Sequence, residues 1–200
     1  MLLRSTLTSP FGRKVTMAAL RLSLNDRIKV ENADVSNPAD PVRRDNPLGK
    51  MPVMILDDGR RLYDSRVILE YIDHLGGGGK IIPKEEKKRF AALTLQSLAD
   101  GMSDAALLVV YEARYRPAEL RHEPWVAYQR EKVERALATL KKDIPDPADF
   151  TVGTLALSAA LGYLDWRKQV DWRKTTPELI KWLDAFRAKA PEYDATHAEG

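Results

Sequence analysis

The sequence predicts an α/β domain over residues 1–76 followed by an all-helical domain over residues 84–200, with a flexible linker at 77–83. Three observations predict this architecture. Strand-like runs alternate with helical patterns before residue 76, only helical periodicity follows residue 84, and a run of four glycines begins at Gly76. Two hundred residues are enough to bury a substantial core in one or two domains.

The first domain should contain four strands. The apolar runs predict strands at 2–6, 27–32, 53–57 and 60–63, and helices at 10–24 and 65–75, with a loose helix or turn near 38–45. The pair Asp58-Gly59 supplies the tight turn of a hairpin between the last two strands. A β-α-β unit followed by a hairpin and a helix is similar to the order found in thioredoxin-like domains.

The second domain shows only helical spacing, which predicts helices at 85–114, 122–142, 152–167 and 177–189. The first of these, with about thirty residues, would be about 45 Å long. Thr151 is in the capping position of the third helix, and Thr154 stands where an acid would complete a capping box. Because a threonine is neutral and β-branched, we expect Thr154→Asp to stabilise this helix.

Composition excludes several classes of function. The chain has no cysteine, which excludes disulfides, thiolate metal sites and a cysteine nucleophile. Its three histidines are too far apart in sequence to form a local metal motif, so we expect no metal. A net charge of +3, with basic residues spread among 29 acids, argues against a nucleic-acid partner.

The N-terminal segment has two interpretations. Its Arg, Lys, Ser and Thr content before Asp26 is typical of a mitochondrial transit peptide, but Leu2, Leu3 and Leu7 fit a strand better. The longest nearly apolar stretch, 152–164, is too short to span a membrane and suits a buried helix. We therefore expect a cytoplasmic protein without a membrane partner.

Three short motifs carry the chemistry of the first domain. Ser9-Pro10 opens the first helix, Met51-Pro52 precedes a strand, and Asp64-Ser65 opens the next helix. Each has an ordinary structural interpretation: a helix cap, a proline at a strand start, and a second helix cap. A helix start also exposes N–H groups that bind anions.

In this order and spacing, the motifs resemble the glutathione-binding half of glutathione S-transferases, in particular the serine-type, bacterial-like cytosolic branch. The resemblance implies a cis Met51–Pro52 bond and a catalytic Ser9 whose hydroxyl donates a hydrogen bond to the thiolate of glutathione, the co-substrate. It also implies a detoxifying transferase that conjugates glutathione to a small electrophile. The residues implied to contact glutathione are Ser9, Phe11, Lys50, Met51, Pro52, Asp64 and Ser65.

The electrophile pocket and the assembly are less directly indicated. Helical spacing suggests that Met102, Ala105 and Val109 line the pocket together with Phe11. The resemblance implies a homodimer in which the mixed-charge face of helix 65–75 meets the partner's long helix. Two alternatives stay open: a glutathione-dependent isomerase or dehalogenase, and a non-catalytic binding or scaffold protein of the same fold. The charged residues assigned to the dimer face are Arg66, Glu70 and Asp73.

Overall fold

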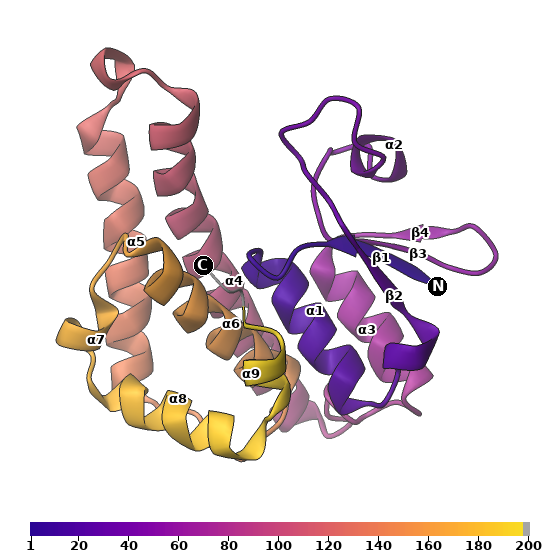
Figure 1. The fold of residues 1–200 in the computed structure, drawn as a ribbon. Helices are drawn as coiled ribbons and strands as arrows, with labels where there is room; N and C mark the ends of the chain where they lie inside the picture. The colour runs from indigo at the N-terminus through magenta and orange to yellow at the C-terminus, as the bar shows by residue number, and fades with distance from the viewer. Residues whose placement is uncertain (198–200) are drawn as a thin grey trace.

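Residues 1–197 are described in the computed structural model, where a four-stranded sheet with its helices lies beside a helical domain (Figure 1). The predicted thioredoxin-like α/β domain followed by an all-helical domain is confirmed. The last part of the predicted second domain, 198–200, lies outside the described residues.

The sheet has the strand order β2-β1-β3-β4. β1 pairs parallel with β2 and antiparallel with β3, and β3 pairs antiparallel with β4. Gly59, at φ +83°, forms the hairpin turn where the Asp-Gly pair predicted it. The strands span Leu2–Ser5 (β1), Lys29–Asn32 (β2), Val53–Ile55 (β3) and Arg61–Leu62 (β4).

Helices α1 and α3 pack against each other beside the sheet, and the short α2 lies apart from them, next to β3 (Figure 1). Helices α1 and α3 begin where their capping residues predict. Ser9 caps α1 and Asp64 caps α3, each accepting a backbone N–H with its side chain. The bounds are Pro10–Arg21 (α1), Val42–Asp45 (α2) and Ser65–Leu75 (α3), with a 3-10 turn at Asn25–Arg27.

Gly12 lets α1 approach β1 closely. A Cβ atom at this position would overlap the Ser5 hydroxyl oxygen, so only glycine fits without a displacement. The N-terminus of α1, which carries Ser9, is thereby held against the end of the central strand.

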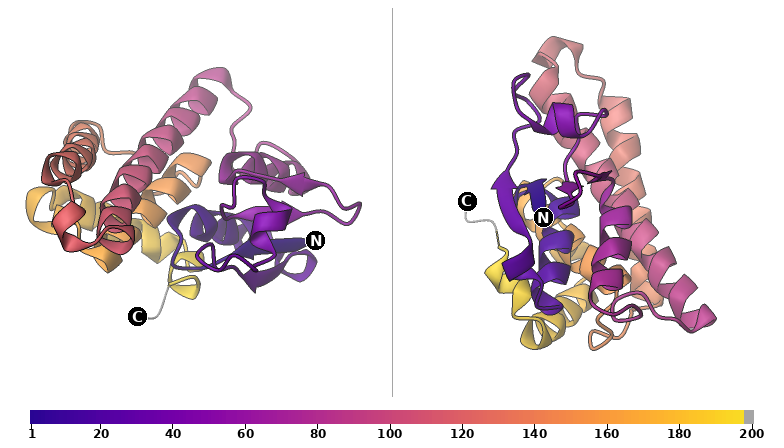
Figure 2. Two further views of the ribbon diagram at one scale, coloured as in Figure 1. Left: turned by 90° about the horizontal axis from the view of Figure 1, so that it is seen from above. Right: turned by 90° about the vertical axis from the view of Figure 1, so that its right-hand side faces the viewer.

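The second domain is built on the long helix α4, which stands beside α5 and α6 (Figure 2). The four predicted long helices are present, with boundaries that differ by at most one residue. Two four-residue helices were not predicted, because so short a segment shows no periodicity. No described helix is both long and apolar enough to cross a membrane. The bounds are Glu86–Tyr115 (α4), Glu123–Lys142 (α5), Val152–Arg167 (α6), Trp172–Thr175 (α7), Glu178–Lys189 (α8) and Glu192–Ala195 (α9), with a 3-10 turn at Ala118–Leu120.

One hydrophobic core runs through both domains. Leu3, Val15 and Ile68 of the first domain belong to the same buried cluster as Leu157 and Phe186 of the second. Helix α1 packs directly on α6, which is buried along most of its length. The two predicted domains therefore share one hydrophobic core and are not joined by the linker alone.

The linker predicted at 77–83 is held by hydrogen bonds to the first domain. The carboxylate of the buried Asp73 accepts hydrogen bonds from the backbone N–H groups of Gly79, Lys80 and Ile81 at 2.7, 2.8 and 2.8 Å. Ile81 and Ile82 are themselves buried. Asp73 consequently holds the linker. The sequence had suggested that it belongs to an exposed dimer face, and that suggestion is wrong.

Thr154 completes a capping box, contrary to expectation. Its Oγ1 accepts the backbone N–H of Thr151 at 2.9 Å and donates to the carbonyl oxygen of Asp149 at 2.6 Å. The side chain is only 1% exposed. Because an aspartate there has no proton to donate to that carbonyl, the expected gain from Thr154→Asp no longer holds.

We predict that Asp73→Asn lowers the free energy of unfolding by about 1–3 kcal/mol. Both carboxylate oxygens accept N–H groups of the linker, and asparagine keeps only one oxygen. Its NH₂ group would therefore face a linker N–H that no longer has an acceptor. Urea denaturation measures the change, with Glu70→Gln on the exposed side of the same helix as the control, expected within about 0.5 kcal/mol of the parent. Equal midpoints for both variants would contradict the role of Asp73.

We predict a similar loss, about 1–3 kcal/mol, for Thr154→Val. Valine keeps the shape of the side chain but leaves the Thr151 N–H and the Asp149 carbonyl without this partner. Thr154→Ser, which keeps the hydroxyl, should retain most of the stability. The idea is refuted if chemical denaturation gives the valine and serine variants the same midpoint.

Candidate functional site

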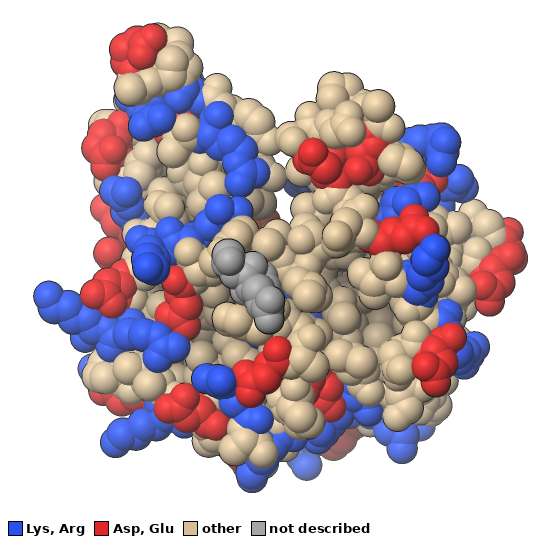
Figure 3. Space-filling model, viewed as in Figure 1, with Lys and Arg blue, Asp and Glu red and all other residues tan. Residues whose placement is uncertain are grey.

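A cleft of about 660 Å³ lies between the two domains. Figure 3 shows the hollow, with basic side chains along the wall of the helical domain and acidic ones on the opposite wall. The first domain contributes the β1–α1 loop and the loops that follow β2 and precede β3. The residues that line the cleft are Thr6, Thr8, Ser9, Pro10, Phe11, Ala33, Asp34, Val35, Ser36, Gly49, Lys50, Met51, Asp104, Leu107, Leu108, Tyr111, Arg114, Tyr163 and Arg167.

Ser9 caps α1 and also lines the cleft. Its Oγ accepts the backbone N–H of Gly12 at 3.3 Å and so caps α1. The same half-buried side chain lines the cleft. Its O–H donates to no acceptor within residues 1–197, so the hydroxyl can donate to a group placed at the start of the helix.

The loop before β3 brings Lys50 and Met51 to the cleft. Asn46 holds this loop, since its Nδ2 donates to the Lys50 carbonyl oxygen at 2.8 Å. The Met51–Pro52 bond is cis, as predicted. Across the described chain, the backbone N–H and C=O of Met51 have no protein partner, whereas Pro52 is buried and does not line the cleft.

Asp64 and Ser65 lie at the beginning of α3, beyond the residues that line the cleft. The Asp64 carboxylate accepts the Arg66 backbone N–H at 3.0 Å, which confirms that it caps this helix. Ser65 is only 2% exposed. Arg66, in the first turn of α3, pairs with Asp100, one helical turn before Asp104 of the cleft, so this helix start is close to the cleft.

A buried charge network that the sequence did not predict lies behind the cleft. Lys14 Nζ meets Asp100 Oδ1 at 2.5 Å, and Arg66 Nε meets the other oxygen of Asp100 at 3.1 Å. Asp104 is one helical turn further along α4. Partial burial, and to a smaller extent the negative charge of Asp100, raises the pKa of the Asp104 carboxyl group. The sequence signal that could have indicated this network is the pair Asp100 and Asp104, two acids four residues apart within a mostly apolar stretch of α4.

The predicted electrophile residues on α4 are wrong. Met102, Ala105 and Val109 are buried on the side of α4 that faces the other helices. Leu107, Leu108 and Tyr111 line the cleft instead. The apolar stripe that suggested a pocket is the stripe that builds the core. Phe11 does line the cleft, with Lys14 Nζ 5.9 Å from the centre of its ring.

Other features do not form a competing site. A larger hollow of about 990 Å³ lies among α6, α7 and the C-terminal helices, but it contains none of the predicted residues. Its arginines are paired, Arg173 with Asp165 at 2.8 Å and Arg187 with Asp194 at 2.9 Å. Within the part of the chain that the structure describes, no group of His, Asp or Glu could hold a metal ion.

The sequence is similar to that of known proteins, both in its N-terminal domain and over most of its length. The family model for the N-terminal domain of glutathione S-transferase matches residues 8–75. The uncharacterised GST-like protein YibF of Escherichia coli is 32% identical over 182 residues, which cover 88% of this chain and 89% of that protein. The match to the family model therefore includes the segments that carry the predicted motifs.

Solved structures agree with these sequence comparisons. A glutathione transferase family member from Pseudomonas fluorescens Pf-5 with bound glutathione is 37% identical, covers 100% of this chain and 99% of its own, and gives a TM-score of 0.92. A second structure described in the same way, with bound S-(propanoic acid)-glutathione, is 36% identical with complete coverage of both chains and a TM-score of 0.89.

We predict that Asp100→Asn costs about 3–5 kcal/mol at pH 7, because it leaves the buried Lys14 ammonium without a counter-charge. Burial already lowers the pKa of Lys14, and Asp100 opposes that effect. In the variant, the folded state binds fewer protons than the unfolded state as the solution becomes alkaline. The deficit should therefore shrink between about pH 7 and pH 10.

Denaturation at both pH values checks this prediction. The double variant Lys14→Met, Asp100→Leu is the control, since apolar replacement of both partners removes the unpaired charge and should recover much of the stability. A deficit in Asp100→Asn that is constant with pH would show that the unpaired Lys14 charge is not its cause.

Proposed function

The chain belongs to the glutathione S-transferase family, and on that premise we propose that it binds glutathione and activates the thiol for conjugation to an electrophilic small molecule. The observation that carries this proposal is the Ser9 hydroxyl, free to donate at the N-terminus of α1 and open to the cleft. It supports a serine-type enzyme. The structures with glutathione and a glutathione conjugate, at 37% and 36% identity, support the choice of ligand.

Simple magnitudes show that Ser9 can perform this activation. A free thiol has a pKa of about 8.5, so only about 3% is thiolate at neutral pH. A hydrogen bond to a charged group contributes about 1.5–3 kcal/mol, and a helix N-terminus adds about 0.3–1 kcal/mol. Lowering the thiol pKa by two pH units requires about 2.7 kcal/mol. One hydroxyl and one helix end supply that amount without a general base.

Other groups of the first domain are suited to bind an extended peptide ligand. The backbone N–H and C=O of Met51 would pair with the cysteinyl residue of glutathione, as in strand addition. The start of α3 would receive the carboxylate of the γ-glutamyl end, with Ser65 and its helix N–H groups as donors. Lys50 would meet a carboxylate from the other side of the loop. The electrophile would lie beyond Phe11, against α4 and α6.

A homodimer remains part of this proposal, with a corrected surface. Arg66 pairs with Asp100 of its own chain and Asp73 holds the linker, so neither is free for a partner. Val67 on α3 and Phe90 on α4 are instead exposed apolar side chains, at 46% and 60%. Sedimentation at micromolar concentration tests the assembly, and a monomer would contradict it.

We predict that Ser9→Ala raises the pKa of the glutathione thiol in the complex by about one to two pH units, since the variant loses a hydrogen bond of about 1.5–3 kcal/mol. Glutathione affinity should change little, because the backbone contacts remain. Ultraviolet titration of the thiolate in the complex measures the effect. Ser9→Thr keeps a hydroxyl and should behave more like the parent.

The same measurements separate the possible outcomes. An unchanged titration curve in Ser9→Ala would show that Ser9 is only a helix cap. Mass spectrometry of glutathione adducts with a panel of electrophiles tests conjugation itself. Glutathione binding without any adduct would exclude a conjugating enzyme, and absence of glutathione binding would refute the proposal as a whole.

A further inference from the structure

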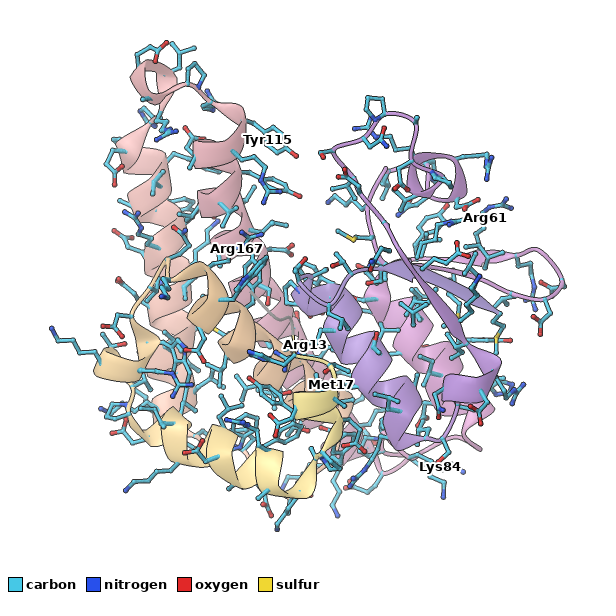
Figure 4. All side chains as sticks on the ribbon, in the orientation of Figure 1. Arg13, Met17, Arg61, Lys84, Tyr115 and Arg167 are labelled. Carbon is cyan, nitrogen blue, oxygen red and sulfur yellow. The ribbon has the colours of Figure 1, made fainter. Side chains whose placement is uncertain are left out.

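Two arginines on the helical wall of the cleft have no ionic partner among residues 1–197. Arg114, near the end of α4, and Arg167, the last residue of α6, both line the cleft. Neither forms an ion pair within 4 Å with any acid of residues 1–197. Figure 4 shows Arg167 at the end of α6, directed toward the space between the domains.

The guanidinium of Arg167 is held at the cleft wall and can bind an anionic group. Its guanidinium lies over the ring of Trp166, 3.6 Å from the ring centre, and this contact fixes the group near the wall. Its buried Nε has no hydrogen-bond partner among the described residues. A planar guanidinium held in this way matches the two oxygens of a carboxylate.

The hydroxyl of Tyr163 is a second, independent observation. Tyr163 is only 4% exposed, yet it lines the cleft. Its hydroxyl has no acceptor for its proton among residues 1–197, and the neighbouring Arg167, through its charge and as a hydrogen-bond donor, lowers its pKa against the larger effect of burial. A buried hydroxyl without a partner is costly, which a ligand oxygen in the cleft would relieve. Arg167 lies 5.8 Å from the centre of the Tyr163 ring.

Tyr111 belongs to the same cluster. Burial raises the pKa of Tyr111 and of Tyr163, while the charges of Arg114 and Arg167 act on both in the opposite direction. Arg114 lies 5.7 Å from the centre of the Tyr111 ring, and Arg167 lies 5.8 Å from the centre of the Tyr163 ring, so each arginine is next to one of the tyrosines. With Leu107 and Leu108 beside them, they form a surface that is apolar and aromatic but positively charged.

The acids that line the cleft form no ion pair within 4 Å with these two arginines, although the Ser36 hydroxyl and, more weakly, the charge of Arg114 lower the pKa of Asp34. Asp34, on the opposite wall, accepts the Ser36 hydroxyl at 2.5 Å and the Ser36 backbone N–H at 2.9 Å. Asp104 is ten residues before Arg114 on α4, about 15 Å along the helix. The basic group of the cleft therefore lies at the C-terminal ends of α4 and α6, away from Asp104.

We propose that Arg114, Arg167 and the Tyr163 hydroxyl bind a carboxylate group of the electrophile, so that the preferred acceptors are aromatic or unsaturated carboxylic acids. The inference rests on the proposed function and names the substrate class of the same cleft. In this arrangement the first domain holds glutathione, and the helical wall selects the acceptor by its charge and its flat apolar body.

Binding of preformed conjugates tests the inference without requiring turnover. Calorimetry on the full chain compares S-(4-carboxybenzyl)glutathione with S-(4-carbamoylbenzyl)glutathione, which differ in charge but hardly in shape, and with glutathione itself. We expect the carboxylate to bind about tenfold or more tightly than the amide. Arg114→Gln, Arg167→Gln and Tyr163→Phe should each reduce this ratio, and the double arginine variant should bring it near one.

Two controls make the result specific. Arg135→Gln removes the same charge from an exposed position on α5 and should leave the ratio unchanged. Glutathione affinity should change less than twofold in all variants, and thermal melting shows that each is folded. Arg114→Gln is the least disruptive variant, because the side chain is exposed.

The outcomes distinguish this inference from the proposed function. Equal affinity for the two conjugates, or a preference that survives in the double variant, overturns the carboxylate site while glutathione binding still supports the transferase proposal. Failure of glutathione and both conjugates to bind overturns both together.

Discussion

The ion pair between Lys14 on α1 and Asp100 on α4 joins the two domains at a place that is closed to water. Each charge is costly to bury alone, so neither helix can shift without leaving the other charge unpaired. Arg66 of α3 contacts the same carboxylate, and three helices consequently meet at one side chain. This junction fixes the start of α1, which carries Ser9, against the helix that forms the opposite wall of the cleft.

Further contacts make the two domains a single unit. The linker is held by Asp73 and by the bond from the Val152 N–H to the Ile81 carbonyl at 2.9 Å. At the other end of the chain, the buried Arg13 of α1 donates to the carbonyl oxygen of Tyr193 at 2.7 Å. The width of the cleft is therefore set by packing between helices and by buried polar contacts, with little freedom left to the linker.

The two walls of the cleft offer different chemistry. The first domain presents backbone groups and helix ends, at Ser9, Met51 and the start of α3, which suit a peptide of constant structure. The helical domain presents the side chains of Tyr111, Arg167 and their neighbours. Side chains can vary without altering the backbone, so such a division lets one fold keep its co-substrate and change its acceptor.

The sequence by itself determined the order of strands and helices, the hairpin turn at Gly59, and the capped helix starts at Ser9 and Asp64. These features depend on neighbouring residues, through caps, turns and apolar spacing. The cis bond before Pro52 was implied by the resemblance of the motifs to a known family. Tertiary structure decided which face of α4 borders the cleft, what Asp73 binds, and how Lys14 meets Asp100. These choices depend on pairing between segments far apart in the chain, which local pattern does not specify.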